Sequence, residues 1–173
     1  MASSIDRPIL RLSRTPLELL LEVAGLSGLL LLVGLVLRSW SSLPERIPHH
    51  FNFRGEVDAW GGRWVLILMA ALAAAFFAGF KILARFPHLG NYPVPITPEN
   101  AERQYRNVRS LLAWLRVEVV WLFVILTWTI IQMGMGSSSR LGWWFTPVFL
   151  GMVLMTAFIH VVRMFRARLD ENI

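Results

Sequence analysis

Four long apolar stretches constrain this chain more than any other feature of its sequence. They cover about residues 17–37, 64–83, 111–133 and 143–165, and each is rich in Leu, Val, Ile, Ala and Phe around its whole circumference. A helix needs roughly 20 residues, at about 1.5 Å each, to cross a hydrocarbon core of about 30 Å. We therefore predict an all-α fold, a four-helix transmembrane bundle with a structured extracytoplasmic loop between its first two helices. The bundle is expected to form a single domain over residues 1–173.

The composition favours a membrane protein and excludes several other classes. Of the 173 residues, 55% are hydrophobic and 16% are charged, whereas soluble domains have roughly 45–50% and about 25%. Cysteine is absent, which excludes disulfides, thiol nucleophiles and metal sites built on thiolates. No secretory cleavage site follows the first apolar stretch, so we expect that stretch to be retained as a helix.

The basic residues predict how the bundle is oriented. Eleven of them lie on the side of the two termini and the second loop, and five lie on the side of the first and third loops. The positive-inside rule then places both termini and residues 84–110 in the cytoplasm and residues 39–63 outside. The third loop, rich in glycine and serine, is predicted to be a short outward hairpin.

The second apolar stretch carries a row of small residues that predicts contact between helices. Ala71, Ala75 and Gly79 recur every four residues, and Ala74 and Ala78 flank them. Small side chains at this spacing let the backbone of a neighbouring helix approach closely. We expect this row to form an interface.

The outward loop, residues 39–63, holds the polar side chains that are the best candidates for a binding site. Gly55 marks one turn, and the pair Gly61–Gly62 marks another just before the second span. The polar and aromatic groups between these turns can converge on one ligand. The ligand candidates are His50, Asn52, Glu56, Asp58 and Trp60.

Three interpretations of these candidates compete. Imidazole and carboxylate groups suit zinc or manganese, and His49 and His50 are the candidate ligands, but their spacing matches no recognised metal motif. The amide and carboxylate side chains can equally cap turns while the aromatic residues lie on the bilayer surface. The third interpretation is recognition of a ligand or peptide outside the cytoplasm.

The loop also contains the pattern Leu-Pro-x-x-Ile-Pro-x-His-Phe-Asn-x-x-Gly-Glu-x-Asp-x-Trp-Gly-x-Arg. Its fixed positions are Leu43, Pro44, Ile47, Pro48, His50, Phe51, Asn52, Gly55, Glu56, Asp58, Trp60, Gly61 and Arg63. This pattern resembles the signature of a bacterial membrane domain of unknown function, which forms the N-terminal part of SdpI-like proteins. His49 and Val57 stand where members often carry Thr and Pro.

SdpI-like proteins are the immunity family against the sporulation-delaying toxin. The resemblance therefore implies a short, stand-alone relative in the bacterial inner membrane, connected with immunity or signalling. It implies a peptide toxin or another membrane protein as a partner. It transfers no catalytic residue to this chain.

The cytoplasmic loop, residues 84–110, is predicted to contain a short amphipathic helix that continues into the third span. Thr97, Pro98 and Glu99 have the order of an N-cap, a first-turn proline and an early acidic residue. Three arginines follow on one side of this helix: Arg103, Arg106 and Arg109. We expect them to bind anionic lipid headgroups. Plain anchoring by positive charge is the alternative, and the basic surface is too small for nucleic acid.

Ionisable side chains inside the spans are costly, so they are candidates for a function. The predicted intramembrane polar cluster consists of Glu18, Glu22, Arg116, Glu118 and His160. Their similar depth predicts that Arg116 pairs with Glu22, or with both glutamates of the first span. Because a histidine side chain ordinarily titrates near neutral pH, a proton relay through His160 and Glu118 is an alternative to structural pairing.

These observations favour a non-enzymatic protein that senses or binds a ligand or peptide at the outer membrane face. Its expected partners are the lipid bilayer, anionic lipids, and a peptide toxin or partner membrane protein, with no cofactor and no nucleic acid. One alternative is a small proton-coupled transporter that uses the buried charges. Another is a metal-binding membrane enzyme built on His49, His50, Glu56 and Asp58.

Overall fold

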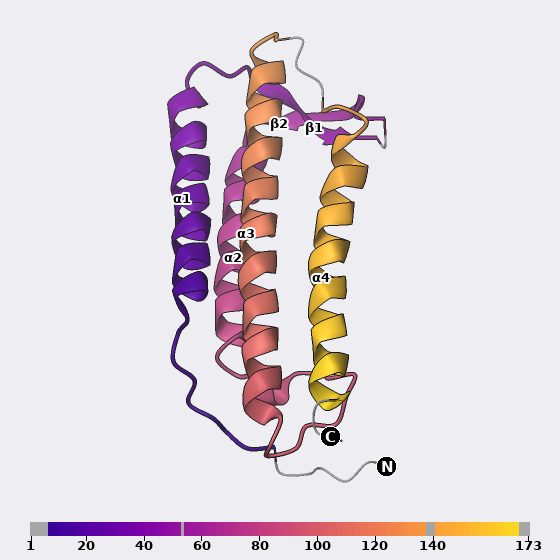
Figure 1. Cartoon of the computed structure of the whole chain (residues 1–173). Helices are drawn as coiled ribbons and strands as arrows, with labels where there is room; N and C mark the ends of the chain where they lie inside the picture. The colour runs from indigo at the N-terminus through magenta and orange to yellow at the C-terminus, as the bar shows by residue number, and fades with distance from the viewer. Residues whose placement is uncertain (1–6, 53, 138–140, 170–173) are drawn as a thin grey trace.

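The fold is a bundle of four long helices with a small β-hairpin at one end, as Figure 1 shows. The computed structural model describes residues 7–52, 54–137 and 141–169. The helices are α1 (Pro16–Ser39), α2 (Val65–Leu83), α3 (Ala101–Gly134) and α4 (Phe145–Leu169). Each is long and apolar enough to cross a membrane, so the prediction of a multi-pass four-helix protein is confirmed. The start of α1 and the end of α4 lie at the end opposite the hairpin.

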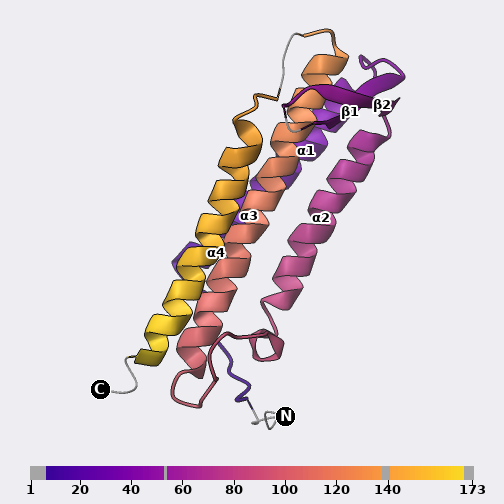
Figure 2. The same cartoon turned by 90° about the vertical axis from the view of Figure 1, so that its right-hand side faces the viewer.

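Helix α3 is the central element of the bundle. It packs against α1, α2 and α4 (Figures 1 and 2), and α4 packs mainly on α3. At about 1.5 Å per residue, its 34 residues extend well beyond a hydrocarbon core of about 30 Å. The predicted continuity of the amphipathic segment with the third span is confirmed, although the helix begins at Ala101, after the N-cap Asn100, and not at Thr97 or Glu99.

The hairpin between α1 and α2 consists of β1 (Arg46–Phe51) and β2 (Val57–Gly62), which pair antiparallel. The sequence predicted an ordered loop and a turn at Gly55, but not the two strands. Gly55 has a φ of +76°, the left-handed conformation that glycine adopts without a steric penalty. The turn prediction is confirmed. Pro48 lies in β1 opposite Trp60, where a register shift interrupts the ladder.

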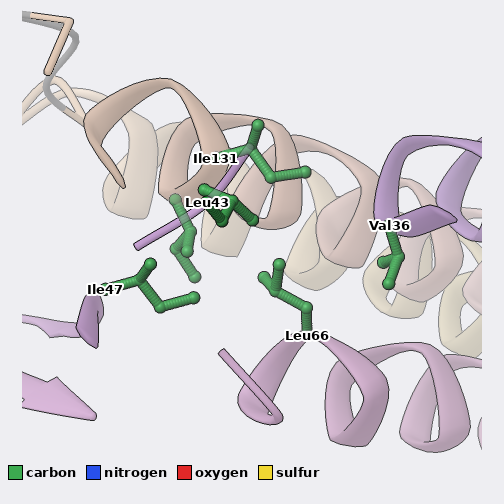
Figure 3. Packing of buried hydrophobic residues seen from close by; sticks show 6 residues of the cluster. Val36, Leu43, Ile47, Leu66 and Ile131 are labelled. Carbon is green, nitrogen blue, oxygen red and sulfur yellow. The ribbon is translucent and has the colours of Figure 1, made fainter. Parts of the chain in front are cut away.

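An apolar cluster fixes the hairpin to the helices, and Figure 3 shows it from close by. Its members come from α1 and the loop that follows it, β1, α2 and α3. They are Val36, Leu43, Ile47, Leu66, Ile130 and Ile131. Ile47 of β1 is 0% exposed. A Cβ atom on Gly134 of α3 would lie 2.9 Å from Leu43 and 3.1 Å from Ile47, so glycine lets the hairpin approach this helix closely.

The packing face of α2 is not the one that its small residues predicted. Within the chain, α2 buries Leu66, Ala73 and Phe77. Ala71 and Ala75 are exposed, and nothing lies within 4 Å of a Cβ added to Gly79. The prediction that this row packs between the spans is wrong. A helix that is apolar around its whole circumference gives no signal of which face is buried.

Candidate functional site

The turn of the hairpin is built from two of the predicted ligand candidates. The Asn52 side-chain oxygen accepts hydrogen bonds from the backbone N–H groups of Arg54 (2.8 Å) and Glu56 (3.1 Å). Its amide nitrogen donates to the Glu56 carboxylate at 3.0 Å. The Asn52 N–H also donates to the backbone oxygen of Glu56 at 2.9 Å. These bonds support the turn-capping interpretation of Asn52 and Glu56.

The other three ligand candidates face solvent on the strands. The His50 ring nitrogen Nδ1 lies 2.6 Å from Asp58 Oδ1, and the two side chains are 67% and 43% exposed. Asp58 and Trp60 are two residues apart on β2, so they project from the same face. Trp60 is 52% exposed. The hairpin thus presents a hydrogen-bonded polar pair and an indole together on its exposed face.

The two histidines do not form a shared ligand set. His49 packs over Gly61, whose added Cβ would lie 2.9 Å from His49 Nδ1, while His50 contacts Asp58. Within residues 7–52, 54–137 and 141–169, no three His, Asp or Glu side chains come close enough together to hold a metal ion. The structure therefore gives no support to the metal-binding interpretation.

At the opposite end of the bundle, Glu22 of α1 is held by two cations that the sequence analysis did not assign to it. Its carboxylate forms an ion pair with Lys81 at the end of α2 and a second one with Arg14 at 3.2 Å. The predicted Arg116–Glu22 pair is therefore replaced by pairs with side chains nearer the helix ends. The prediction paired charged residues by their depth in the membrane but left out Lys81. This residue lies only two residues before the end of α2, and comparing its depth with that of Glu22 would have indicated the pair.

Glu18 joins three segments of the chain. Its carboxylate accepts from Arg109 of α3 at 2.7 Å and from the backbone N–H of Thr15 at 2.9 Å. Thr15 in turn caps the start of α1, because its hydroxyl accepts from the Glu18 N–H. Arg109 also donates to the backbone oxygen of Leu12 at 3.0 Å. The carboxylate therefore links the start of α1 to α3.

Residues 7–15, which we call the N-terminal strap, are fixed at both ends. Arg109 holds Leu12, as described above. Arg7 donates to the backbone oxygens of His88 and Gly90, at 3.1 and 2.6 Å, and its guanidinium lies 5.4 Å from the centre of the Tyr92 ring. Burial raises the pKa of Tyr92 above its ordinary value, and its protonated hydroxyl donates to the Pro87 oxygen at 2.8 Å.

Arg116 lies deeper in the bundle and is only 6% exposed. Its guanidinium lies over the ring of Phe77, 4.9 Å from the ring centre, which is the geometry of a cation–π interaction. Its buried Nε has no hydrogen-bond partner among the described residues. The carboxylate of Glu22 is already paired with Lys81 and Arg14. Among the described residues, Arg116 therefore forms no ion pair.

These charged groups surround a cavity of about 640 Å³, which we call the basic cavity. It lies between the N-terminal strap, α1, the end of α2 and α3. Ligand pockets typically have volumes of about 300–1,000 Å³. Its acidic lining residues are Glu18 and Glu22, and its basic ones are Arg11, Arg14, Lys81, Arg85, Arg109 and Arg116.

The three predicted headgroup arginines separate in the structure. Arg109 lines the basic cavity. Arg106 lies outside it and pairs with Glu102 one turn earlier at 2.8 Å. Arg103 also has a partner. Headgroup binding by all three remains a prediction. Of the three, Arg109 is the one that lines the basic cavity.

Glu118 and His160, the remaining members of the predicted cluster, lie in the interface between α3 and α4. The Thr156 hydroxyl donates to Glu118 Oε1 at 2.5 Å. Nearer the termini, side-chain amides of α3 donate to backbone oxygens of α4: Gln104 to Met164 at 2.9 Å and Asn107 to His160 at 2.8 Å. Polar bonds of this kind replace the hydrophobic effect as a source of helix association in lipid.

The hydrogen bonds of His160 determine its neutral tautomer. Nδ1 lies 2.8 Å from the Thr156 carbonyl oxygen, which can only accept, so Nδ1 carries the proton. In the neutral ring, Nε2 then accepts from the Ser110 hydroxyl at 3.3 Å. Thr156 contacts both Glu118 and His160, but its carbonyl oxygen cannot pass on a proton. A proton relay therefore remains a prediction that no direct contact between the two groups supports.

Replacing Thr156 by valine is expected to lower the stability of the bundle by about 1–2 kcal/mol, because it removes the donor to a buried carboxylate. The other carboxylate oxygen, Oε2, is buried and has no partner among the described residues. Thermal unfolding in detergent measures the effect. Thr156→Ser retains the hydroxyl and is the matched control. Equal melting temperatures for the two variants would contradict the importance of this bond.

Residues 28–74 match the family model described as Domain of unknown function (DUF1648). The matched range runs from the middle of α1 through the hairpin to the middle of α2. It contains the turn and most of the residues that fix the hairpin to the bundle, including Leu43, Ile47 and Leu66. The predicted relation to a membrane domain of unknown function is confirmed. No curated protein and no solved structure matches the chain significantly.

Proposed function

We propose that the chain is a non-enzymatic protein of the bacterial inner membrane that binds a ligand or peptide through the outer face of its hairpin. The observation that carries the proposal is the exposed His50–Asp58 pair beside the exposed Trp60. An indole and a hydrogen-bonded polar pair on one face supply apolar contact area together with directional hydrogen bonding. The resemblance of the loop to SdpI-like proteins favours a peptide as the ligand.

The way the hairpin is held supports a recognition role. Its turn is closed by the hydrogen bonds of Asn52, and its base is fixed by the buried Ile47. Binding residues that are held in one geometry lose less conformational freedom when a ligand docks. The distribution of basic residues, eleven against five, supports an outward hairpin and cytoplasmic termini.

Photo-crosslinking in intact cells tests the proposal. A photoreactive amino acid at position 60 is expected to give a discrete adduct with an extracytoplasmic peptide or protein, which mass spectrometry then identifies. The control carries the same amino acid in place of the exposed Leu89, at the opposite end of the bundle, and is expected not to give this adduct. The adduct at position 60 is expected to disappear when His50→Ala and Asp58→Ala are introduced together.

Two outcomes would contradict the proposal. One is the absence of any adduct at position 60 in cells where the protein is correctly inserted. The other is an adduct that persists at full yield without the side chains of His50 and Asp58. In both cases the exposed pair would have no role in recognition.

A further inference from the structure

We propose that the basic cavity binds the phosphate group of an anionic lipid headgroup. The proposal is independent of ligand binding at the hairpin, because the cavity lies at the opposite end of the bundle. Six basic and two acidic side chains line it, which gives its wall a formal net charge of +4. A bound anion would offset this excess.

Within residues 7–52, 54–137 and 141–169, ion pairs do not neutralise the excess charge. Glu18 and Glu22 are occupied by Arg109, Lys81 and Arg14. Arg11, Arg85 and Arg116 have no carboxylate within 4 Å among the described residues. The first two are exposed at the cavity, whereas Arg116 is buried.

Arg116 is the second, independent observation that points to an anion. A guanidinium is costly to bury without a carboxylate or phosphate partner. Arg116 is 6% exposed, lines the cavity and leaves its buried Nε without a partner. Its planar fork of donors suits two oxygens of one phosphate group. An anion in the cavity would therefore satisfy a group that the described part of the chain leaves without a partner.

The surroundings of the cavity favour a lipid over a soluble phosphate. The cavity lies where α1 begins and α2 ends, which is the level of the headgroups for a spanning helix. Its lining also includes apolar side chains: Leu10 of the strap, Phe80 of α2 and Leu112 of α3. The neighbouring Ile9 is 78% exposed. Apolar walls next to a basic centre suit a molecule with a charged head and acyl chains.

Lipid titration of the protein in a phosphate-free detergent, followed by native mass spectrometry, tests this proposal. Dioleoylphosphatidylglycerol is the anionic probe, dioleoylphosphatidylcholine is the zwitterionic comparison, and inorganic phosphate is the soluble one. We expect phosphatidylglycerol to bind at least tenfold more tightly than phosphatidylcholine. Inorganic phosphate that displaces the lipid at equal concentration would support the anion site but assign it to a soluble phosphate.

Two variants probe the cavity itself. Replacing Arg11 and Arg85 by glutamine is expected to weaken phosphatidylglycerol binding about 25-fold, since each basic side chain near an anionic surface contributes a factor of about five. Arg116→Met is expected to weaken binding without lowering the melting temperature, because it removes a buried, unpaired charge. The matched control replaces Arg38 and Arg54, two exposed arginines at the hairpin end of the bundle, by glutamine, which removes the same charge outside the cavity.

The control distinguishes a cavity from a diffuse basic surface. We expect the Arg38 and Arg54 variant to bind phosphatidylglycerol within twofold of the unmodified protein. Equal weakening by the control and by the cavity variant would overturn the proposal, and so would unchanged binding when Arg11 and Arg85 are replaced. If Arg116→Met fails to fold, the variant with Arg11 and Arg85 replaced still tests the proposal, because both side chains are exposed.

Discussion

Gly55→Ala is expected to destabilise the hairpin end of the protein by about 2–5 kcal/mol. A left-handed conformation costs a residue with a Cβ about 1–2 kcal/mol, and Gly55 has a φ of +76°. The added Cβ would also lie 1.7 Å from the backbone oxygen of Leu141, in the connection between α3 and α4. Relieving this overlap requires backbone movement, which typically costs a further 1–3 kcal/mol or so. Thermal unfolding in detergent measures the loss.

Gly136→Ala separates the two contributions. Gly136 has a φ of +83°, but nothing lies within 4 Å of its added Cβ. We therefore expect this control to lose only the conformational part, about 1–2 kcal/mol. Equal destabilisation by the two substitutions would show that the hairpin does not pack against Leu141 as described.

Gly28→Leu is expected to force α1 away from α3 and to destabilise the bundle by about 2–3 kcal/mol. A Cβ at this position would lie 2.7 Å from a methyl group of Val120, a residue of α3 with 0% exposure. The indole of Trp121 lies next to it and donates to the Ala24 oxygen at 3.1 Å. Separation of the helices would break this bond as well. Thermal unfolding in the same detergent measures the change.

Gly34→Leu, on the same helix, is the matched control. Nothing lies within 4 Å of a Cβ at position 34. Leucine also favours a helix over glycine by about 0.5–1 kcal/mol, so stability should be unchanged or slightly higher. A Gly28 variant as stable as the Gly34 variant would contradict the close approach of α1 and α3.

The positions of the helices along the chain could be predicted, because the length of an apolar run depends on the membrane it must cross. The predicted first span, about residues 17–37, corresponds to α1 at Pro16–Ser39, and the second, about 64–83, to α2 at Val65–Leu83. The turn predicted at Gly55 is present, and the positive φ of this residue explains why glycine occupies it. Of the third loop, residues 138–140 lie outside the described part of the chain.

The rotation of each helix about its axis could not be predicted in the same way. A helix that is apolar all round lacks the polar face that fixes its orientation. Ala71 and Ala75 are therefore exposed, although their spacing favoured an interface. For the same reason Glu22 meets Lys81 and Arg14, while Arg116 meets Phe77.

The candidate sites depend on contacts between segments distant in the sequence. Arg109 and Leu12 are 97 residues apart, and their bond helps to fix the strap beside the basic cavity. Neither local spacing nor composition predicts such a contact. The strands were missed for a related reason. Strand β1 contains a proline, and the burial of Ile47 against the helices, which helps to fix its position, is a long-range contact.

Cysteine labelling tests the membrane orientation on which both proposals build. Because the chain has no cysteine, single replacements report one position each: Arg54→Cys in the turn of the hairpin and Leu89→Cys at the opposite end. We expect a membrane-impermeant maleimide to label position 54 in intact cells and position 89 only after the membrane is opened. Labelling of position 89 but not 54 in intact cells would contradict the orientation, and recovery of the chain in a detergent-free soluble fraction would contradict membrane insertion itself.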